Sequence, residues 1–187
     1  MDQLSIKVNQ STAKEISPQD DGGNMQSRLK IHEIFHSLQG EADAIGWPTA
    51  FIRLTGCPLR CQYCDTEYAF TGGQWNSFKD ILELVDSYQV RHVCVTGGEP
   101  LAQKRCHDLL AQLCDRDYSV SLETSGALSI ENVDPRVNIV MDIKTPDSNE
   151  SDKQLWENLK YIKPSDQLKF VICSHTDFVW AANQVLE

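Results

Sequence analysis

The chain has 187 residues, of which 41% are hydrophobic, so it is long enough to bury the core of one domain without disulfides. Its 17 basic and 27 acidic side chains give a formal net charge of −10, the wrong sign for a surface that neutralises nucleic-acid phosphates. No window approaches the roughly 20 apolar residues of a membrane-spanning helix, and no secretory signal opens the chain. We therefore expect a cytoplasmic protein that acts on a small molecule, without direct contact to nucleic acid or membrane.

The first predicted element is a leader. Residues 1–28 are polar, rich in Gly, Asp, Gln and Ser, and lack a sustained hydrophobic period. Such a segment cannot bury enough apolar surface to fold, so it is predicted to be disordered. Six runs rich in β-branched residues follow, and each predicts a strand. They are residues 29–35, 49–56, 92–98, 119–126, 138–144 and 167–173.

Helices are predicted between and after the later strands, where apolar residues recur at three- and four-residue steps. They are residues 77–88, 101–114, 152–162 and 177–187. Alternating strands and helices predict parallel pairing with right-handed crossovers. Because a complete eight-unit barrel takes about 250 residues, the fold expected for residues 29–187 is α/β, a partial, open β/α barrel of about six mostly parallel strands.

Polar or glycine-rich stretches stand at the ends of four predicted strands, at residues 55–56, 96–100, 123–126 and 142–144. In parallel β/α folds the carboxyl ends of the strands meet at one edge, which is where sites are built. The functional site is therefore predicted at this edge.

Three of the seven cysteines, Cys57, Cys61 and Cys64, lie close together in the stretch GCPLRCQYCDT. An odd number of cysteines in a reducing compartment favours metal binding or catalysis over a disulfide framework. Three thiolates leave one coordination position open, as a metal centre that binds a reactant needs. Two centres compete for these thiolates. One is a zinc ion completed by a histidine such as His36 or His92, although the spacing argues against it because zinc sites favour paired C-x2-C units. The other is a [4Fe–4S] cluster whose fourth iron faces outward.

Two motifs together indicate a family. CPLRCQYC resembles the C-x3-C-x2-C cluster loop of radical S-adenosylmethionine enzymes, and TGGEP resembles the GGE motif of the same superfamily. The finer resemblance covers residues 35–185 and is to the 7-carboxy-7-deazaguanine synthase family. The stretches that carry it are FHSLQGE, FIRLTGCPLRCQYCDT, VTGGEP, LETSG, MDIKTP, LWENL and LKFVI.

This resemblance implies a carbon–nitrogen lyase that converts 6-carboxy-5,6,7,8-tetrahydropterin to 7-carboxy-7-deazaguanine with loss of ammonia. The pathway is queuosine and 7-deazapurine biosynthesis, whose product serves tRNA modification or a secondary metabolite. The implied cofactors are a [4Fe–4S] cluster, S-adenosyl-L-methionine and Mg²⁺. A homodimer and an external electron donor such as flavodoxin are implied as partners. No catalytic side chain is expected, because the radical is generated on the cofactor.

Carried over position by position, the family motifs assign ligands in this sequence. The cluster falls on Cys57, Cys61 and Cys64, and magnesium falls on Thr66. The S-adenosylmethionine site comprises Tyr63, Asp65, Gly98, Glu99, Ser125, Asp142 and Lys144. The substrate site comprises Leu38, Gln39, Gly40, Arg53 and Thr96. Arg53 suits the pterin carboxylate, because a guanidinium binds a carboxylate through two parallel hydrogen bonds. Gly97 and Gly98 are expected to let the backbone approach the ligand.

Some of these residues have simpler interpretations when taken alone. Residues 96–100 also fit a turn before a helix, Thr66 fits a helix N-cap, and Arg53 fits a surface position on a strand. Two alternative functions follow from the same motifs. A glycyl-radical activase shares the cluster loop but leaves Gln39-Gly40 and Cys64-Asp65-Thr66 unexplained. The other alternative is a non-catalytic, zinc-stabilised binding module, in which the turn Gly97-Gly98-Glu99 would have no functional role.

Three positions depart from the family pattern. Ala42 follows Gln39-Gly40-Glu41 where the family commonly has glycine, and Asp142-Ile143-Lys144 replaces a frequent Ser-Pro-Lys. The sequence ends at Glu187, whereas relatives continue to a C-terminus that closes over the substrate. We therefore expect cluster and S-adenosylmethionine binding to be retained, and turnover to depend on that missing segment or on a partner subunit.

Overall fold

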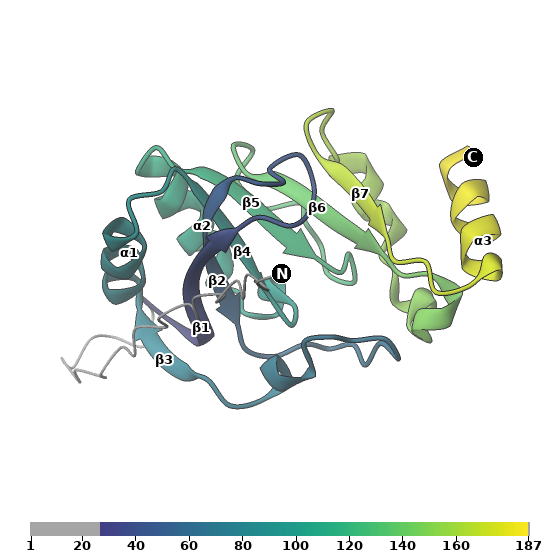
Figure 1. Ribbon diagram of the computed structural model, residues 1–187, viewed down its shortest axis with the longest axis horizontal. Coiled ribbons are helices and arrows are strands. Elements are labelled where there is room, and N and C mark those ends of the chain that lie inside the picture. The colour runs from purple at the N-terminus through teal and green to yellow at the C-terminus, as the bar shows by residue number, and fades with distance from the viewer. Residues whose placement is uncertain (1–26, 187) are drawn as a thin grey trace, which may run out of the picture.

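The computed structural model describes residues 27–186, in which one open sheet carries helices and turns (Figure 1). Its seven strands lie in the order β3-β1-β2-β4-β5-β6-β7. They are β1 (Arg28–Leu38), β2 (Pro48–Leu54), β3 (Gln74–Ser77), β4 (His92–Gly97), β5 (Ser119–Thr124), β6 (Asn138–Ile143) and β7 (Gln167–Phe170). The sheet does not close, so the expected partial barrel is confirmed. Residues 1–26 of the predicted leader lie outside the described residues, and Arg28 already begins β1.

The six predicted strands all form and are mostly parallel, as expected, and the structure adds a seventh strand, β3. The run from β2 to β7 through β4, β5 and β6 is parallel, whereas β1 pairs antiparallel with β2 and with β3. Residues 39–47 are too few for a parallel crossover, which needs a dozen or more residues. The additional strand β3 has the polar sequence QWNS and gains its place by pairing with the start of β1.

Two predicted α-helices form close to their expected bounds, α1 (Phe78–Ser87) and α3 (His175–Leu186). The Ser77 hydroxyl accepts a hydrogen bond from the Asp80 backbone N–H at 3.1 Å, which caps α1. The helix expected over residues 101–114 begins late, as α2 (Cys106–Asp115), after the 3₁₀ turn η3 (Pro100–Ala102). No helix within the described part of the chain is long and apolar enough to cross a bilayer.

The prediction of an α-helix over residues 152–162 was wrong. That segment forms the 3₁₀ turns η5 (Ser151–Lys153) and η6 (Trp156–Tyr161). Fully buried Asn158 explains the difference, because its amide group is bonded to the β5–β6 connection. It donates to the carbonyls of Gly126 at 3.1 Å and Leu128 at 2.9 Å and accepts from the Ile130 N–H at 3.1 Å. These tertiary bonds outweigh local helix propensity.

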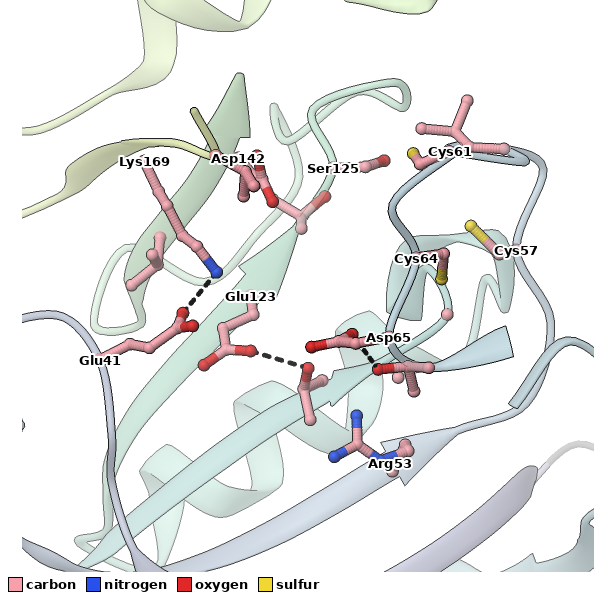
Figure 2. A pocket seen from close by; sticks show the side chains of 18 of the residues that line it. Glu41, Arg53, Cys57, Cys61, Cys64, Asp65, Glu123, Ser125, Asp142 and Lys169 are labelled. Atoms are coloured by element: carbon pink, nitrogen blue, oxygen red, sulfur yellow. Dashed lines mark hydrogen bonds and ion pairs between the residues drawn. The ribbon is translucent and has the colours of Figure 1, made fainter. Parts of the chain in front are cut away.

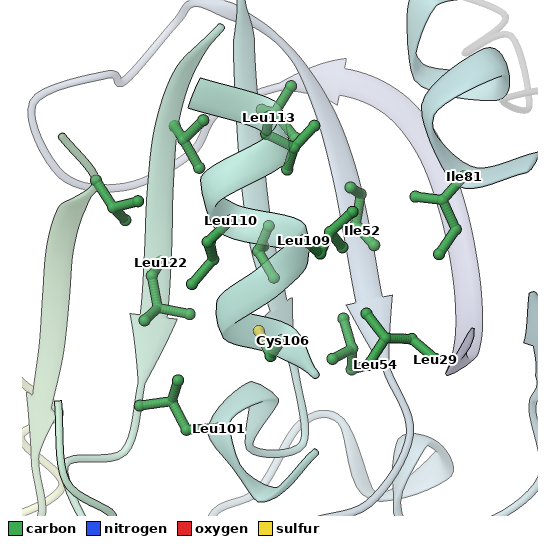
Figure 3. Close-up of a cluster of buried hydrophobic side chains, with 14 of the residues drawn as sticks. Leu29, Ile52, Leu54, Ile81, Leu101, Cys106, Leu109, Leu110, Leu113 and Leu122 are labelled. Atoms are coloured by element: carbon green, nitrogen blue, oxygen red, sulfur yellow. The ribbon is translucent and has the colours of Figure 1, made fainter. Parts of the chain in front are cut away.

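Alternate residues of the parallel strands face opposite sides of the sheet. One side of the sheet packs against the helices. Helix α2 lies over the strands, and its leucines are buried between the helix and the sheet (Figure 3). Apolar residues on this side include Ile52, Leu54, Val95, Leu122 and Met141. The other side carries the residues in between, which line a cavity: Phe51, Arg53, Thr96, Glu123 and Asp142.

The ends of β4 and β5 are joined by the side chain of Glu99, which is fully buried. Its carboxylate accepts hydrogen bonds from the backbone N–H groups of Leu101 at 3.0 Å and Ser125 at 2.7 Å. The hydroxyls of Ser125, at 2.6 Å, and Thr124, at 3.0 Å, also donate to it. A buried carboxylate is tolerated where such donors replace its hydration.

Replacing Glu99 by Ala should therefore destabilise the fold. The substitution leaves the Leu101 and Ser125 N–H groups buried without acceptors, and each unpaired group costs about 1–3 kcal/mol. We expect the free energy of unfolding to fall by roughly 2–5 kcal/mol, measured by urea denaturation of the reduced apoprotein. Glu99→Gln keeps one acceptor oxygen and should lose less.

The matched control is Glu83→Ala, which removes a carboxylate from an exposed ion pair with Lys79 on α1. Such surface pairs contribute about 0–1 kcal/mol. A Glu99→Ala protein as stable as Glu83→Ala would show that the buried carboxylate does not hold the strand ends together.

Candidate functional site

A cavity of about 540 Å³ opens at the carboxyl ends of the parallel strands (Figure 2). Its volume lies within the range of roughly 300–1,000 Å³ that is typical of small-molecule sites. The segment after β2, which contains the three motif cysteines, forms one wall. Strands β2, β4, β5, β6 and β7 and the connection between β1 and β2 contribute the other lining residues. The predicted placement of the site at this edge of the sheet agrees with the position of the cavity.

The cluster loop, residues 56–66, is held in place by bonds to distant parts of the chain. The Gly56 N–H donates to the Ala69 carbonyl at 2.8 Å, and the Gln62 N–H donates to the Ser148 carbonyl at 3.0 Å. The Arg60 N–H donates to the Glu150 carboxylate at 2.6 Å. Hydrogen bonds to other parts of the chain therefore hold the loop in this conformation.

Cys57, Cys61 and Cys64 are partly buried, line the cavity and form no disulfide. Figure 2 shows their sulfurs on the loop around a shared space at one end of the cavity. Burial raises the pKa of the Cys57 and Cys61 thiols. A metal centre is what stabilises such thiols in their deprotonated form. The donor set fits a sulfur-ligated cluster with one position turned to the cavity.

The glycine turn after β4 packs directly against the start of the cluster loop. A Cβ at Gly98 would lie 2.4 Å from the Gly56 carbonyl oxygen and 2.8 Å from the Cys57 Cβ. A Cβ at Gly97, whose φ is +150°, would lie 2.4 Å from the Leu54 carbonyl oxygen. The glycines were expected to admit a ligand, and the close approach in this structure is to the chain's own backbone.

Most residues assigned to S-adenosylmethionine meet at the cavity. Tyr63, Asp65, Gly98, Ser125, Asp142 and Lys144 line it. Glu99 does not line it, because its carboxylate is buried among the donors described above. Glu99 instead contacts a residue that lines the cavity, because its carboxylate accepts hydrogen bonds from the backbone N–H and the hydroxyl of Ser125.

Asp142 and Lys144 form an ion pair at 3.1 Å on the cavity wall. Burial disfavours the charged form of Lys144, but Asp142, Cys61 and Tyr63 together outweigh this effect, so the pKa of Lys144 is raised. Asp142 Oδ1 is buried and has no hydrogen-bond partner within residues 27–186. An acceptor left in this way fits a ligand that brings an amino or hydroxyl donor to the cavity, as S-adenosylmethionine does.

Four of the five residues assigned to the substrate also line the cavity: Gln39, Gly40, Arg53 and Thr96. Leu38 does not, since its side chain is 63% exposed outside the cavity. Thr66, the residue assigned to magnesium, lies at the cavity, and its hydroxyl donates to Asp65 Oδ1 at 2.7 Å. It precedes the turn η2 (Glu67–Phe70) but makes no side-chain capping bond there.

Three charged residues of the cavity were missed in the sequence: Glu41, Glu123 and Lys169. The Glu123 carboxylate accepts hydrogen bonds from the Thr96 hydroxyl at 2.9 Å and the Gln39 amide at 3.4 Å. Lys169 on β7 forms an ion pair with Glu41 on the side of the cavity away from the cysteines (Figure 2). Glu123 could have been predicted, because it belongs to the polar strand end at residues 123–126. The pair of Lys169 with Glu41 could not, because the two residues are far apart in sequence.

The histidines considered as zinc ligands lie elsewhere. His92 bonds to the Thr49 hydroxyl at 2.8 Å, and His36 stacks on Tyr88. Neither lines the cavity that holds the three cysteines. Within residues 27–186, no three His, Cys, Asp or Glu side chains converge around a single point as they would for one metal ion.

Comparisons with known proteins agree with this geometry. The sequence model of the Radical SAM superfamily matches residues 51–165. The 7-carboxy-7-deazaguanine synthase of Chlorobaculum tepidum is 42% identical over 163 residues, which are 86% of this chain and 74% of that protein. The synthase of the same name from Thermoplasma acidophilum is 39% identical over 159 residues, 84% of this chain and 76% of that protein.

A solved structure supports the same conclusion. The crystal structure of QueE from Escherichia coli matches with a TM-score of 0.73 and 26% sequence identity, over 85% of this chain and 77% of that chain. The matches extend well beyond the cysteine motif, over the sheet and the cavity. The chain belongs to the radical SAM superfamily and, within it, to the 7-carboxy-7-deazaguanine synthase family.

Proposed function

We propose that the protein is a radical S-adenosylmethionine lyase that converts 6-carboxy-5,6,7,8-tetrahydropterin to 7-carboxy-7-deazaguanine, with loss of ammonia, in queuosine biosynthesis. One observation carries this proposal: a single cavity brings the three cluster cysteines together with Arg53, a carboxylate-binding side chain. Membership of the synthase family decides against the zinc-stabilised binding module and gives no support to the glycyl-radical activase.

The cofactor end of the cavity is built by the cluster loop and by β6. Cys57, Cys61 and Cys64 would hold three corners of a [4Fe–4S] cluster. When bound, the cluster and S-adenosylmethionine supply the one-electron chemistry that starts the rearrangement. Asp142 offers its unpartnered oxygen to a donor of the cofactor, while Lys144 keeps the other oxygen occupied and the carboxylate oriented.

The substrate end is built by β2, β4 and β5. The terminal nitrogens of Arg53 would bind the pterin carboxylate in a bidentate manner. Glu123 is an acceptor held by the Thr96 hydroxyl and the Gln39 amide, so it suits the N–H groups of an aminopyrimidinone ring. A carboxylate at one end of the ligand and N–H donors at the other would therefore each meet a matching group.

Several finer assignments rest on the family resemblance. Magnesium would bind Thr66 and a substrate carboxylate oxygen, since Mg²⁺ prefers hard oxygen ligands and uses few protein groups. The protein would act as a homodimer in the cytoplasm and take its electron from an external donor such as flavodoxin. The seven cysteines, none of them in a disulfide, suit a reducing compartment.

The first prediction from the proposed function tests the cluster. Anaerobically reconstituted protein, reduced with dithionite, should give a [4Fe–4S]⁺ electron paramagnetic resonance signal that changes when S-adenosylmethionine is added. It should convert 6-carboxytetrahydropterin to 7-carboxy-7-deazaguanine, detected by mass spectrometry. Cys61→Ala should retain less iron and lose turnover, because one cluster corner has no ligand.

Cys173→Ala is the matched control, since this thiol is exposed and away from the cavity. It should keep both the resonance signal and turnover. If the wild-type protein formed the cluster and responded to S-adenosylmethionine but left the pterin unchanged, the superfamily assignment would stand and the proposed substrate would be wrong.

The second prediction concerns the carboxylate anchor. Arg53→Lys should raise the KM for 6-carboxytetrahydropterin by about 10- to 100-fold, because an ammonium cannot replace the two parallel hydrogen bonds of a guanidinium. The change of the resonance signal with S-adenosylmethionine should persist. Arg136→Lys, at an exposed arginine paired with Asp134, is the control and should leave the KM unchanged.

The third prediction concerns magnesium. Thr66→Ala should lose most of the stimulation of turnover by Mg²⁺ while keeping the rate measured without the ion, because the hydroxyl ligand is removed. Thr66→Ser retains a hydroxyl and should retain the stimulation. Equal Mg²⁺ dependence in all three proteins, measured by titrating the metal in the turnover assay, would exclude Thr66 as a ligand.

A further inference from the structure

Arg53 is held by an acidic partner that lies outside the cavity. Its Nε donates a hydrogen bond to Glu33 Oε1 at 2.7 Å, and the two side chains are 16% and 35% exposed. Glu33 and Arg53 are directly opposite each other in the antiparallel pairing of β1 with β2, so their side chains leave the sheet on the same side. Glu33 does not itself line the cavity.

A second side chain completes this arrangement. The Tyr68 hydroxyl donates to the same oxygen, Glu33 Oε1, at 3.0 Å. Burial raises the pKa of Tyr68, the charge of Arg53 lowers it, and the bond to Glu33 raises it again, so the net shift is upward and the phenol remains a donor. The Tyr68 ring lies 5.0 Å from the His32 ring, centroid to centroid. The carboxylate of Glu33 is thereby fixed from two directions.

The guanidinium is also confined by aromatic rings. The Arg53 Cζ lies 5.9 Å from the centroid of the Phe35 ring and 5.8 Å from that of Tyr68. Both distances are within the range of cation–π attraction. Within the described part of the chain, Nε is the one guanidinium nitrogen of Arg53 that donates a hydrogen bond to a protein acceptor. The terminal NH₂ groups are left for a ligand, and Figure 2 shows the side chain reaching from β2 toward the cavity.

We propose that Glu33, assisted by Tyr68, is a positioning residue that aims the terminal nitrogens of Arg53 at the carboxylate of the substrate. This inference rests on the proposed function and adds to it a residue that does not touch the ligand. Glu33 accepts the hydrogen bond of Arg53 Nε, the donor that a carboxylate bound to the two terminal nitrogens does not use. It also restricts the rotamers of the Arg53 side chain before the substrate binds, so less conformational entropy is lost on binding.

The charge of Glu33 acts in the opposite direction, because a carboxylate beside Arg53 weakens the attraction of the guanidinium for a second carboxylate. The two effects predict opposite results when Glu33 is removed. If orientation dominates, carboxylate binding weakens; if charge dominates, carboxylate binding tightens. The pair is partly exposed, where charge effects are screened by solvent, and this favours orientation.

The test compares two fluorescent pterins, 6-carboxypterin and unsubstituted pterin, which differ by the carboxylate. Their equilibrium binding to anaerobically reconstituted protein with S-adenosylmethionine is measured by fluorescence. The wild type should prefer 6-carboxypterin. Glu33→Ala should weaken 6-carboxypterin binding about tenfold and leave unsubstituted pterin unchanged, so the preference is lost.

Two variants separate positioning from general damage. Glu33→Gln retains an acceptor oxygen for Arg53 Nε without the charge and should keep the preference for the carboxylated ligand within about threefold. Glu83→Ala removes a carboxylate from the exposed pair with Lys79 and should change neither binding constant. A structural defect would weaken both ligands equally, which would overturn the proposal.

The remaining outcomes are equally decisive. An unchanged or tighter binding of 6-carboxypterin by Glu33→Ala would overturn the positioning role while leaving the proposed function intact. Failure of the wild type to prefer 6-carboxypterin, with the resonance response to S-adenosylmethionine present, would overturn the proposed function and the role of Glu33 together. In turnover, the positioning role should raise the KM of Glu33→Ala while kcat changes less.

Discussion

The two-residue alternation of the parallel strands is the constraint on which the site depends. On β2, Ile52 and Leu54 pack under the helices while Arg53 points to the cavity. A register shift of one residue would send Arg53 into the apolar core and bring the two aliphatic side chains to the ligand. The same alternation separates Leu122 from Glu123 on β5. The core between the sheet and the helices therefore fixes the direction of every strand-borne functional side chain, although the strand residues Ile52, Leu54 and Leu122 of this core do not line the cavity.

The second constraint is the contact between the glycine turn and the cluster loop. Gly98 lies so close to Gly56 and Cys57 that a methyl group does not fit, and the Glu99 N–H donates to the Gly56 carbonyl at 2.8 Å. The Glu99 side chain then ties the turn to Ser125. One short stretch thus connects the cysteine wall to the ends of β4 and β5. Its sequence is constrained by packing within the chain before any cofactor is considered.

Local sequence patterns predicted the strands, the open sheet and the cysteine-bearing wall, because hydrophobic period and motif spacing are properties of neighbouring residues. They could not predict β3, which has little strand propensity and exists through its pairing with β1. They predicted a helix where the side chain of Asn158 instead bonds to a connection about 30 residues away. The ion pair of Glu41 with Lys169 and the bond of Tyr68 to Glu33 are likewise tertiary. Neither carries a signal in the spacing of the chain.

Within residues 27–186, the cations that line the cavity are all paired with carboxylates, so the orientation of their free donors, rather than an excess of positive charge, has to recognise an acidic ligand. The pairs are Arg53 with Glu33, Lys144 with Asp142 and Lys169 with Glu41. They are not equivalent, because a guanidinium has five N–H donors in a rigid plane, whereas an ammonium has three on one atom. Arg53 can bind Glu33 through Nε and still offer a parallel pair of donors. A lysine at this position would have to share one nitrogen between the partner and the ligand, so the anchor requires arginine for geometric reasons as well as for its charge.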